Sequence, residues 1–452
     1  MKKHLSVKSV FFVIVALCSA YPLVMLSCSK VQHFELSRFI SPDTCGGCHD
    51  EVHGQWKNSM HNLSQVDAIY RAAAFHYLKG LTDADEIAEA ESCVKCHTPI
   101  GFFSGFPKTV SQERDNPEKV PEIAKEGIQC DFCHSVTGAY AIYNNQVKLD
   151  PGHGEADPGT KRGPFKDSKS DYHKSEYSAF HGSSEMCGVC HDVRHVVFGT
   201  KLETTFEEWQ KSAYNAPDAK KRVNCQNCHM YQRPGVPATG STPRPQNPGT
   251  AAQGGPRRDH IYTHYFVGAN MAIPGSRNDA VREEMAVERL KHAAELSIDD
   301  AKIKEGKISV TVKNTGAGHN LPTGLTDVRQ MWLEVVVRDA AGRTVFSTGV
   351  ADANGYLPKG SIVYNTVFGD GKGNAVDNIA KARQILRDRR VPPLGSLEEV
   401  IALPATGAKT LEVRARLRYM GAPQELIDTL AGKGKISIPA VTMAEAKKTI
   451  TM

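Results

Sequence analysis

The chain of 452 residues is poor in aromatic side chains and carries little net charge. Phe, Trp and Tyr together make up 7 % of the residues, and the formal net charge is +5. A charge this small excludes the strongly basic surface that binds nucleic acid. The hydrophobic content of 40 % and the charged content of 23 % are ordinary for a soluble globular protein, and the length allows two or three domains.

The first 28 residues lack the features of a folded domain. Three lysines within the first eight residues precede a mostly apolar run from Val10 to Leu26, which is typical of an export signal. Ser27 and Cys28 end the run in the manner of a bacterial lipoprotein signal, so we expect a lipid at Cys28 to attach the chain to a membrane. Ordinary cleavage and an uncleaved anchor are the alternatives. All three place the rest of the chain in the periplasm or at the surface of a bacterial cell.

The cysteines are not scattered as disulfide partners usually are. Ten of the 12 form five C-x-x-C pairs, and a histidine follows every pair. We number these motifs 1 to 5 along the chain: CGGCH (45–49), CVKCH (93–97), CDFCH (130–134), CGVCH (187–191) and CQNCH (225–229). Chance would supply only about 0.01 such matches in a chain of this composition. The five motifs are therefore not a product of chance, and they indicate sites with a chemical role.

The spacing within each motif suits covalent attachment of haem c. Residues three apart lie on one face of a helical turn, so both thiols can bond one haem and the next residue can ligate its iron. The attachment residues are Cys45, Cys48, Cys93, Cys96, Cys130, Cys133, Cys187, Cys190, Cys225 and Cys228, and the iron ligands are His49, His97, His134, His191 and His229. Zinc would need two pairs per metal, and five pairs is an odd number. Disulfides or redox dithiols need no histidine after each pair. We therefore expect five covalently attached haem c groups with their irons.

All five motifs lie between residues 45 and 229. A segment so densely occupied cannot also build a large aliphatic core, so we expect a pentahaem cytochrome domain over 29–270. It should have the multihaem cytochrome c fold, in which short helices and loops surround the haems with little regular structure. Within it, residues 233–258 contain six prolines and five glycines, which favours an extended strap or a linker.

A different pattern begins after residue 270. Apolar residues recur at helical spacing through 278–296, which predicts a bridging helix over 271–296. Apolar and polar residues then alternate around 308–313, 333–338 and 411–418, which is typical of half-buried antiparallel strands. We therefore expect a C-terminal all-β, immunoglobulin-like sandwich over 297–452.

The axial position opposite each motif histidine decides between electron transfer and catalysis. An iron with a second side-chain ligand passes electrons, whereas an open iron can bind a substrate. Twelve histidines outside the motifs and the signal are available for five such positions. Their sequence contexts favour His61, His173, His181, His264 and His319. No motif ends in lysine, the variation that marks the catalytic haem of pentahaem nitrite reductases.

Several segments resemble a known family. TCGGCHDEVHGQWKNSMH (44–61) resembles the opening of the cytochrome c-552/4 (c554 and c-prime) family, in which an aromatic residue and a distal histidine follow the anchor, here Trp56 and His61. The later anchors ESCVKCHTP, GPFKDSKSDYHKSEYSAFHGSSEMCGVCHDV and NCQNCHM look similar to the same group. GAGHNLPTG, DRRVPPLGSLEEV and LEVRARLRYM resemble a C-terminal β-module of related bacterial cytochromes. The resemblance implies electron transfer through mostly bis-histidine haems, with an open haem in some relatives.

Three functions follow from these patterns. The favoured one is an electron carrier that exchanges electrons with redox partner proteins or an extracellular acceptor, with no assigned catalytic residue. The alternative is an oxidoreductase with one open haem that acts on a small nitrogen or sulfur species. The third is a structural subunit of an extracellular cytochrome assembly, and an oligomer is compatible with each.

Overall fold

The computed structural model describes residues 32–451. The predicted signal over 1–28 and the predicted lipidation of Cys28 lie outside these residues. From His33 onward the contacts of the chain define a single unit. In the described range, no helix is both long and apolar enough to cross a membrane.

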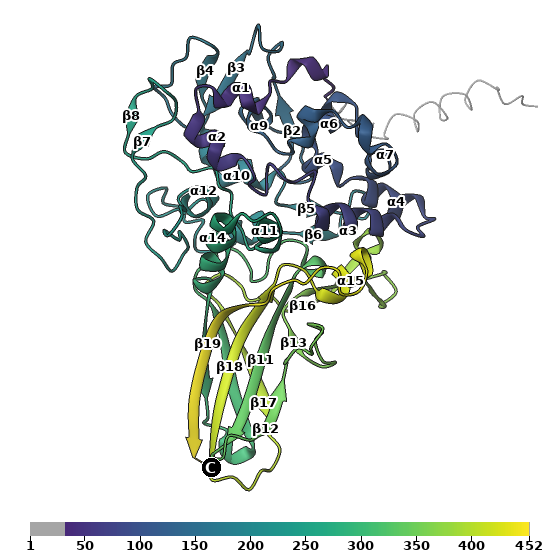
Figure 1. Ribbon diagram of the computed structural model, residues 1–452, viewed down its shortest axis with the longest axis vertical. Helices are drawn as coiled ribbons and strands as arrows, with labels where there is room; N and C mark the ends of the chain where they lie inside the picture. Colours follow the sequence, from purple (N-terminus) through teal and green to yellow (C-terminus); the bar gives the residue numbers. More distant parts are fainter. Residues whose placement is uncertain (1–31, 452) are drawn as a thin grey trace, which may run out of the picture. The chain divides into compact units, whose positions relative to one another are not determined.

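Residues 33–229 form short helices that are joined by loops and small strand pairs (Figure 1). The α-helices are α1 (Pro42–Gly46), α2 (Asp50–Trp56), α3 (Ala68–Leu78), α4 (Ala84–Glu91), α5 (Val94–His97), α6 (Pro99–Ser104), α7 (Val110–Asp115), α8 (Glu122–Lys125), α9 (Cys130–His134), α10 (Ser184–Gly188), α11 (Thr205–Gln210) and α12 (Cys225–His229). The strands are β1 (Val136–Ala139), β2 (Val147–Leu149), β3 (Thr160–Gly163), β4 (Lys174–Tyr177), β5 (Val193–Arg194) and β6 (Lys201–Glu203). Short 3₁₀ turns lie at Leu36–Arg38, Pro117–Lys119 and Ala179–Gly182. The expected multihaem arrangement of short helices and loops is confirmed.

Apolar side chains in this region gather in small separate clusters. One surrounds Phe103, Phe132 and Val136, another contains Ala73 and Tyr77, and further small groups lie under the neighbouring loops. The phenyl rings of Phe103 and Phe132 are stacked with 6.2 Å between their centres. No cluster here approaches the size of the one in the C-terminal region, which agrees with a segment that packs around prosthetic groups.

The segment between the two regions differs in part from its prediction. Residues 233–258 contain only β7 (Gly249–Thr250) and β8 (Arg257–Arg258), as their prolines and glycines require. The helix predicted over 271–296 is too long: the chain forms α13 (Ala272–Ser276) and α14 (Ala280–Lys291), and a strand begins at Ala294. The break has a local cause, because Asn278 has a positive φ and the Asp279 carboxylate caps α14 by accepting from the amide of Arg282 (3.1 Å).

The C-terminal region is built from antiparallel sheets. Its strands are β9 (Ala294–Asp299), β10 (Lys307–Asn314), β11 (Gln330–Asp339), β12 (Thr344–Thr348), β13 (Ile362–Val363), β14 (Thr366–Gly369), β15 (Ala375–Val376), β16 (Gln384–Asp388), β17 (Ser396–Ala402), β18 (Thr410–Met420) and β19 (Val441–Thr451). One sheet has the order β17-β10-β9, and a second has the order β12-β11-β18-β19 with β13 also paired to β11. A third small sheet has the order β15-β14-β16. Helix α15 (Gln424–Ala431) and 3₁₀ turns at Ile303–Glu305, Thr326–Val328 and Ile379–Lys381 complete the region.

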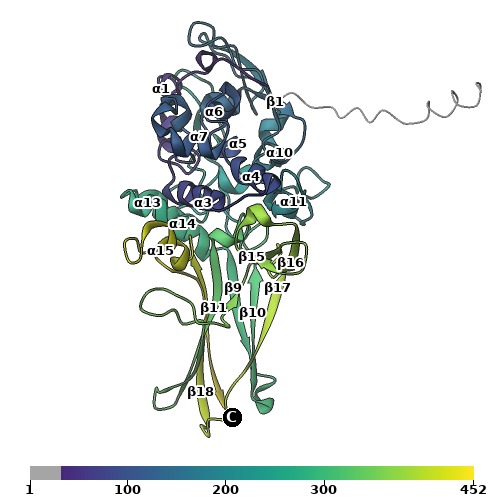
Figure 2. The same cartoon turned by 90° about the vertical axis from the view of Figure 1, so that its right-hand side faces the viewer.

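The two larger sheets share one hydrophobic core. Val310 on β10 and Val335 on β11 are fully buried in the same cluster, so the inner faces of the two sheets pack against each other. Figure 2 shows β9 and β10 beside β11. On the opposite face of β11, Glu334 accepts a hydrogen bond from Arg416 of β18 (2.8 Å). The expected alternation of apolar and polar residues is therefore present in these strands.

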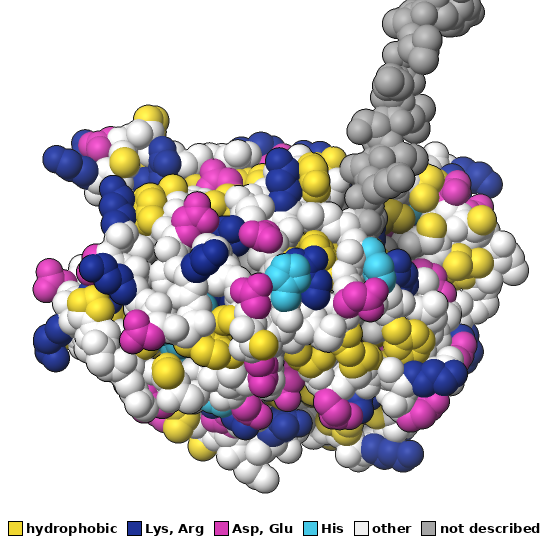
Figure 3. Space-filling model, turned by 90° about the horizontal axis from the view of Figure 1, so that it is seen from above, with side chains coloured by type: hydrophobic (Ala, Val, Ile, Leu, Met, Phe, Trp, Pro, Cys, Tyr) yellow, Lys and Arg dark blue, Asp and Glu magenta, His cyan; other side chains and the backbone are white. Residues whose placement is uncertain are grey.

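Side chains of the helical region bond directly to the β-rich region. The hydroxyl of Tyr77 donates to Asp327, and the amide of Asn378 donates to the carbonyl of Tyr77 (2.8 Å). The imidazole of His195, whose Nδ1 accepts from two backbone amides, donates through Nε2 to the carbonyl of Ala380 (2.9 Å). Seen from the helical end, the surface mixes acidic and basic side chains rather than separating them by sign (Figure 3).

Candidate functional site

Each of the five motifs occupies about one turn of helix. Motifs 2, 3 and 5 coincide with α5, α9 and α12, motif 1 begins within α1, and motif 4 begins within α10. In motifs 1, 2 and 4 the histidine amide donates to the carbonyl of the first cysteine over 2.9 to 3.2 Å. The first turns of motifs 3 and 5 are capped by the side chains of Gln129 and Asn224. This turn presents two thiols and an imidazole to the same space.

The five motif histidines share one hydrogen-bonding arrangement. In four of them Nδ1 lies next to a backbone carbonyl: Ala251 O for His49 (2.7 Å), Ser64 O for His97 (3.0 Å), Arg162 O for His134 (2.5 Å) and Val267 O for His229 (3.0 Å). In the fifth, Nδ1 of His191 lies 3.4 Å from Oε1 of Glu203. These oxygens can only accept, so Nδ1 carries the proton and Nε2 keeps its lone pair for a metal.

A second histidine lies across from four of the motif histidines. The ring centres are 6.4 Å apart for His49 and His173, 5.7 Å for His134 and His181, 6.3 Å for His191 and His61, and 6.5 Å for His229 and His319. The ring planes in these pairs are 14° to 27° apart. Imidazole–metal bonds of about 2.0–2.1 Å on both sides of one ion place the ring centres about 6 to 6.5 Å apart. Four pairs thus have the spacing of two axial ligands.

Motif 2 is built differently. Among the described residues, no histidine ring pairs with His97; instead the ring of Tyr70 is stacked on it, with 3.8 Å between the ring centres and 4° between the planes. The Tyr70 hydroxyl donates to Glu113 (3.3 Å), and this buried carboxylate also faces Arg71 (3.5 Å) and the amide of Gln65 (3.1 Å). Tyr70 therefore orients the imidazole of His97 by stacking, and its hydroxyl is bonded to Glu113.

Burial keeps most of these imidazoles neutral, which is the form that ligates iron. Desolvation lowers the pKa of His61 and of His134 to about 3, and it holds the pKa of His229 well below its ordinary value. His191 is the exception. Desolvation lowers its pKa, but the hydrogen bond to Glu203 and the charge of that carboxylate raise the pKa overall.

Contacts between cysteines show which motifs are neighbours. The side chains of Cys45 in motif 1 and Cys130 in motif 3 lie close together, and so do those of Cys187 in motif 4 and Cys225 in motif 5. Cys190 of motif 4 likewise contacts a thiol of motif 2, and it interacts with a thiol of motif 3. Motif 4 therefore lies at a junction that reaches motifs 2, 3 and 5.

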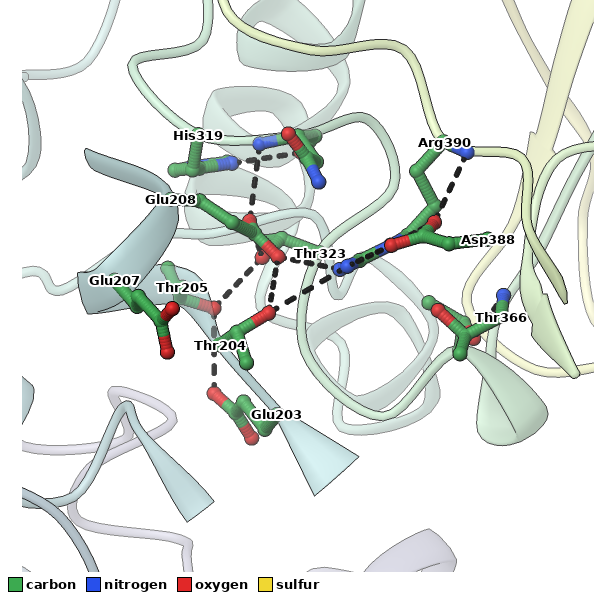
Figure 4. A network of polar contacts seen from close by, with 12 residues as sticks. Glu203, Thr204, Thr205, Glu207, Glu208, His319, Thr323, Thr366, Asp388 and Arg390 are labelled. Carbon is green, nitrogen blue, oxygen red and sulfur yellow. Dashed lines mark hydrogen bonds and ion pairs between the residues drawn. The ribbon is translucent and has the colours of Figure 1, made fainter. Parts of the chain in front are cut away.

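A buried polar network links motif 4 to the loop that carries His319 (Figure 4). The hydroxyl oxygens of Thr205 and Thr323 lie 2.7 Å apart, with Thr205 as the donor, and the Thr205 hydroxyl also lies 3.4 Å from an oxygen of Glu203. The carboxylate of Glu208 on α11 accepts from Thr323 (2.7 Å) and from the amide of Asn320 (3.0 Å). Its other oxygen pairs with Arg390, which Asp388 also holds (2.7 Å).

These residues fit haem c. Every motif offers two free thiols for the vinyl groups and one imidazole whose orientation is fixed through Nδ1, as metal-bound histidines require. At four motifs a second imidazole stands at axial distance. The His134–His181 pair fits least well, because Nε2 of His181 lies 3.0 Å from the carbonyl of Cys133.

Comparison with known proteins agrees with this donor set. Residues 44–135, which contain motifs 1, 2 and 3, match the family model of cytochrome c554 and c-prime. The structure is similar to the crystal structure of a penta-heme cytochrome c552 from Thermochromatium tepidum, with a TM-score of 0.61 and 20 % identity, over 92 % of this chain and 100 % of that chain. The fold is that of a multihaem c-type cytochrome. No curated protein matches the chain. The motifs, the family match and the cytochrome fold together support five covalently bound haem c groups.

Of the five histidines predicted as distal ligands, four lie opposite a motif histidine. His61, His173, His181 and His319 each lie opposite a motif histidine, in motifs 4, 1, 3 and 5 respectively. The ring of His264 pairs with no motif histidine in the described residues; its Nδ1 donates to the carbonyl of Tyr262 (2.9 Å), and its ring contacts Phe266. The sequence patterns also missed Tyr70, Glu203, Glu208 and Arg390. None of these has a local signal, because each acts on a ligand that is distant along the chain.

Proposed function

We propose that the chain is an extracytoplasmic electron-transfer cytochrome with five haem c groups. The observation that carries this proposal is the set of four histidine pairs at axial distance. Haem c with two imidazole ligands supplies a one-electron centre that binds no further ligand. The second histidines therefore close four of the five sites to substrates, and the contacts among motif cysteines bring the sites next to one another.

The export signal supports a location in the periplasm or at the cell surface, with a lipid on Cys28 as the membrane attachment. Partners that suit such a chain are redox proteins or an extracellular acceptor that dock transiently. The mixed charges on the face in Figure 3 favour contacts that are specific in shape rather than driven by one sign of charge.

Motif 2 favours a second candidate function. His97 has no histidine partner in the described residues, so an iron held there keeps an open position. The nearby Tyr70, Arg71 and Glu113 offer hydroxyl, guanidinium and carboxyl groups. An oxidoreductase that acts on a small nitrogen or sulfur species at this site is the alternative function.

The spin state of the iron tests both candidates. We expect the purified ferric protein to show mainly low-spin iron, with about one iron in five high-spin, because motif 2 alone lacks a second imidazole. After reduction, carbon monoxide should bind to about one haem per chain. Electron paramagnetic resonance, absorption spectra and carbon monoxide titration measure these quantities.

Two other outcomes would each remove one of the candidates. If all of the iron is low-spin, motif 2 has no open site, and electron transfer is the candidate function that remains. High-spin iron well above one part in five would show that the histidine pairs do not ligate, and the electron-transfer proposal would lose its supporting observation.

A further inference from the structure

One motif histidine has a hydrogen-bond acceptor unlike those of the others. His49, His97, His134 and His229 face neutral backbone carbonyls, whereas His191 faces the carboxylate of Glu203 at 3.4 Å. All five contacts use the same atom, Nδ1, and all five motifs have the same spacing. The chain therefore contains one charged acceptor and four neutral ones at otherwise equivalent positions.

The Glu203 side chain is held in place from several sides. Glu203 ends β6, where it pairs with Val193 of β5, and its side chain is only 16 % exposed. The Thr205 hydroxyl lies 3.4 Å from the same oxygen that faces His191, and Thr205 is in turn bonded to Thr323 of the β-rich region. These contacts and the low exposure of the side chain place the carboxylate charge beside the imidazole.

A charged acceptor changes the ligand in a known direction. An imidazole that donates Nδ1–H to a carboxylate is a more basic ligand than one that donates to a carbonyl, because the negative charge draws the proton away from the ring. A more basic ligand and a fixed negative charge both favour ferric over ferrous iron, so the reduction potential falls. Protein screens a partly buried charge less than water does, so the charge of Glu203 keeps more of its effect on the iron.

We propose that Glu203 is a positioning residue that lowers the reduction potential of the motif 4 iron through His191. The proposal rests on the proposed electron-transfer function and assigns one of its five centres a distinct potential. A lower reduction potential at motif 4 would affect its neighbours, because motif 4 lies next to motifs 2, 3 and 5.

The test is Glu203→Gln in the full haem-loaded chain. Glutamine keeps a neutral oxygen in reach of Nδ1, so the motif 4 site would then resemble the other four. We expect potentiometric titration to show one of the five midpoint potentials shifted upward, with smaller shifts at the centres next to it. We also expect the g values of one low-spin ferric signal to change in electron paramagnetic resonance.

Glu207→Gln is the matched control. It removes the same charge from the neighbouring helix α11, where the Glu207 carboxylate pairs with Lys201 and Lys211 and touches no motif histidine. We expect all five potentials and all low-spin signals to stay as in the unmodified chain.

Two outcomes would overturn the proposal: unchanged potentials in Glu203→Gln, or equal shifts in both variants. If Glu203→Gln does not take up haem, Glu203→Asp decides the question, because it keeps the charge but retracts it from His191. An upward shift of one centre supports the proposal, and no shift contradicts it. The proposed function fails separately, through excess high-spin iron in the unmodified chain.

Discussion

Replacing His319 with alanine is expected to raise the high-spin ferric fraction from about one iron in five to about two in five. The His319 ring stands 6.5 Å from that of His229, and no other histidine ring pairs with His229 in the described residues. The loop itself should survive. Asn314 donates to the carbonyl of residue 319 (2.8 Å), and Glu208 holds the next amide, so neither contact needs the imidazole.

Absorption spectra, electron paramagnetic resonance and carbon monoxide titration measure the change. Binding should rise from about one to about two carbon monoxide molecules per chain, because the iron at motif 5 loses its second ligand. His292→Ala is the control, since the imidazole of His292 is exposed at the end of α14 and its hydrogen bond goes to the carbonyl of Glu288 (2.8 Å) rather than to a motif residue. An unchanged spin state in His319→Ala would show that the β-rich region supplies no ligand.

The attachment residues were predictable because their signal is local. Cysteines at positions 93 and 96 and the following His97 need only one helical turn to reach one haem, and a turn is specified by adjacent residues. The β-rich region was predictable for a similar reason. Strict alternation over 333–338 specifies a strand with one buried face, and β11 buries Leu333, Val335 and Val337 completely.

The pairing of the axial ligands was not predictable from spacing. His61 follows motif 1 closely, yet it stands opposite His191 of motif 4, while His49 faces His173. Tertiary folding decides which imidazoles lie opposite each other. Such contacts join residues that are far apart in the chain, so they leave no regular spacing in the sequence. His264, whose place beside a proline-rich strap suggested a ligand, pairs with no motif histidine in the described residues and packs on Phe266, so its role stays a prediction.

Groups that tune or hold a ligand are harder still to predict. Four of the five Nδ1 acceptors are backbone carbonyls, which every residue has, so no side chain marks them. Glu208 and Arg390 look like ordinary surface charges in the sequence. Only the contact between α11 and the segment after β16 makes them a buried pair.

Replacing Arg390 with methionine is expected to lower the free energy of unfolding by about 3–5 kcal/mol. The side chains of Arg390 and Glu208 are each only 7 % exposed, and methionine would leave a buried carboxylate without its positive partner. Loss of the contact with Asp388 adds to the effect. Denaturant unfolding, followed by far-ultraviolet circular dichroism and by haem absorption, measures it. Arg343→Met is the control: the Arg343 side chain is 81 % exposed, and Asp339 keeps its bonds from the backbone amides of Ala341 and residue 343, so we expect little change.

A second substitution separates charge from packing. Adding Glu208→Gln to Arg390→Met removes the unpaired charge while it keeps an oxygen for Thr323 and the amide of Asn320. We expect the double variant to recover part of the lost stability, since removing both charges of a buried pair costs less than removing one. If the stability recovers, the His319 loop should return to its place, and the fraction of low-spin iron should then rise as well. If Arg390→Met alone leaves both stability and spin state unchanged, this ion pair does not hold the β-rich region on motif 5.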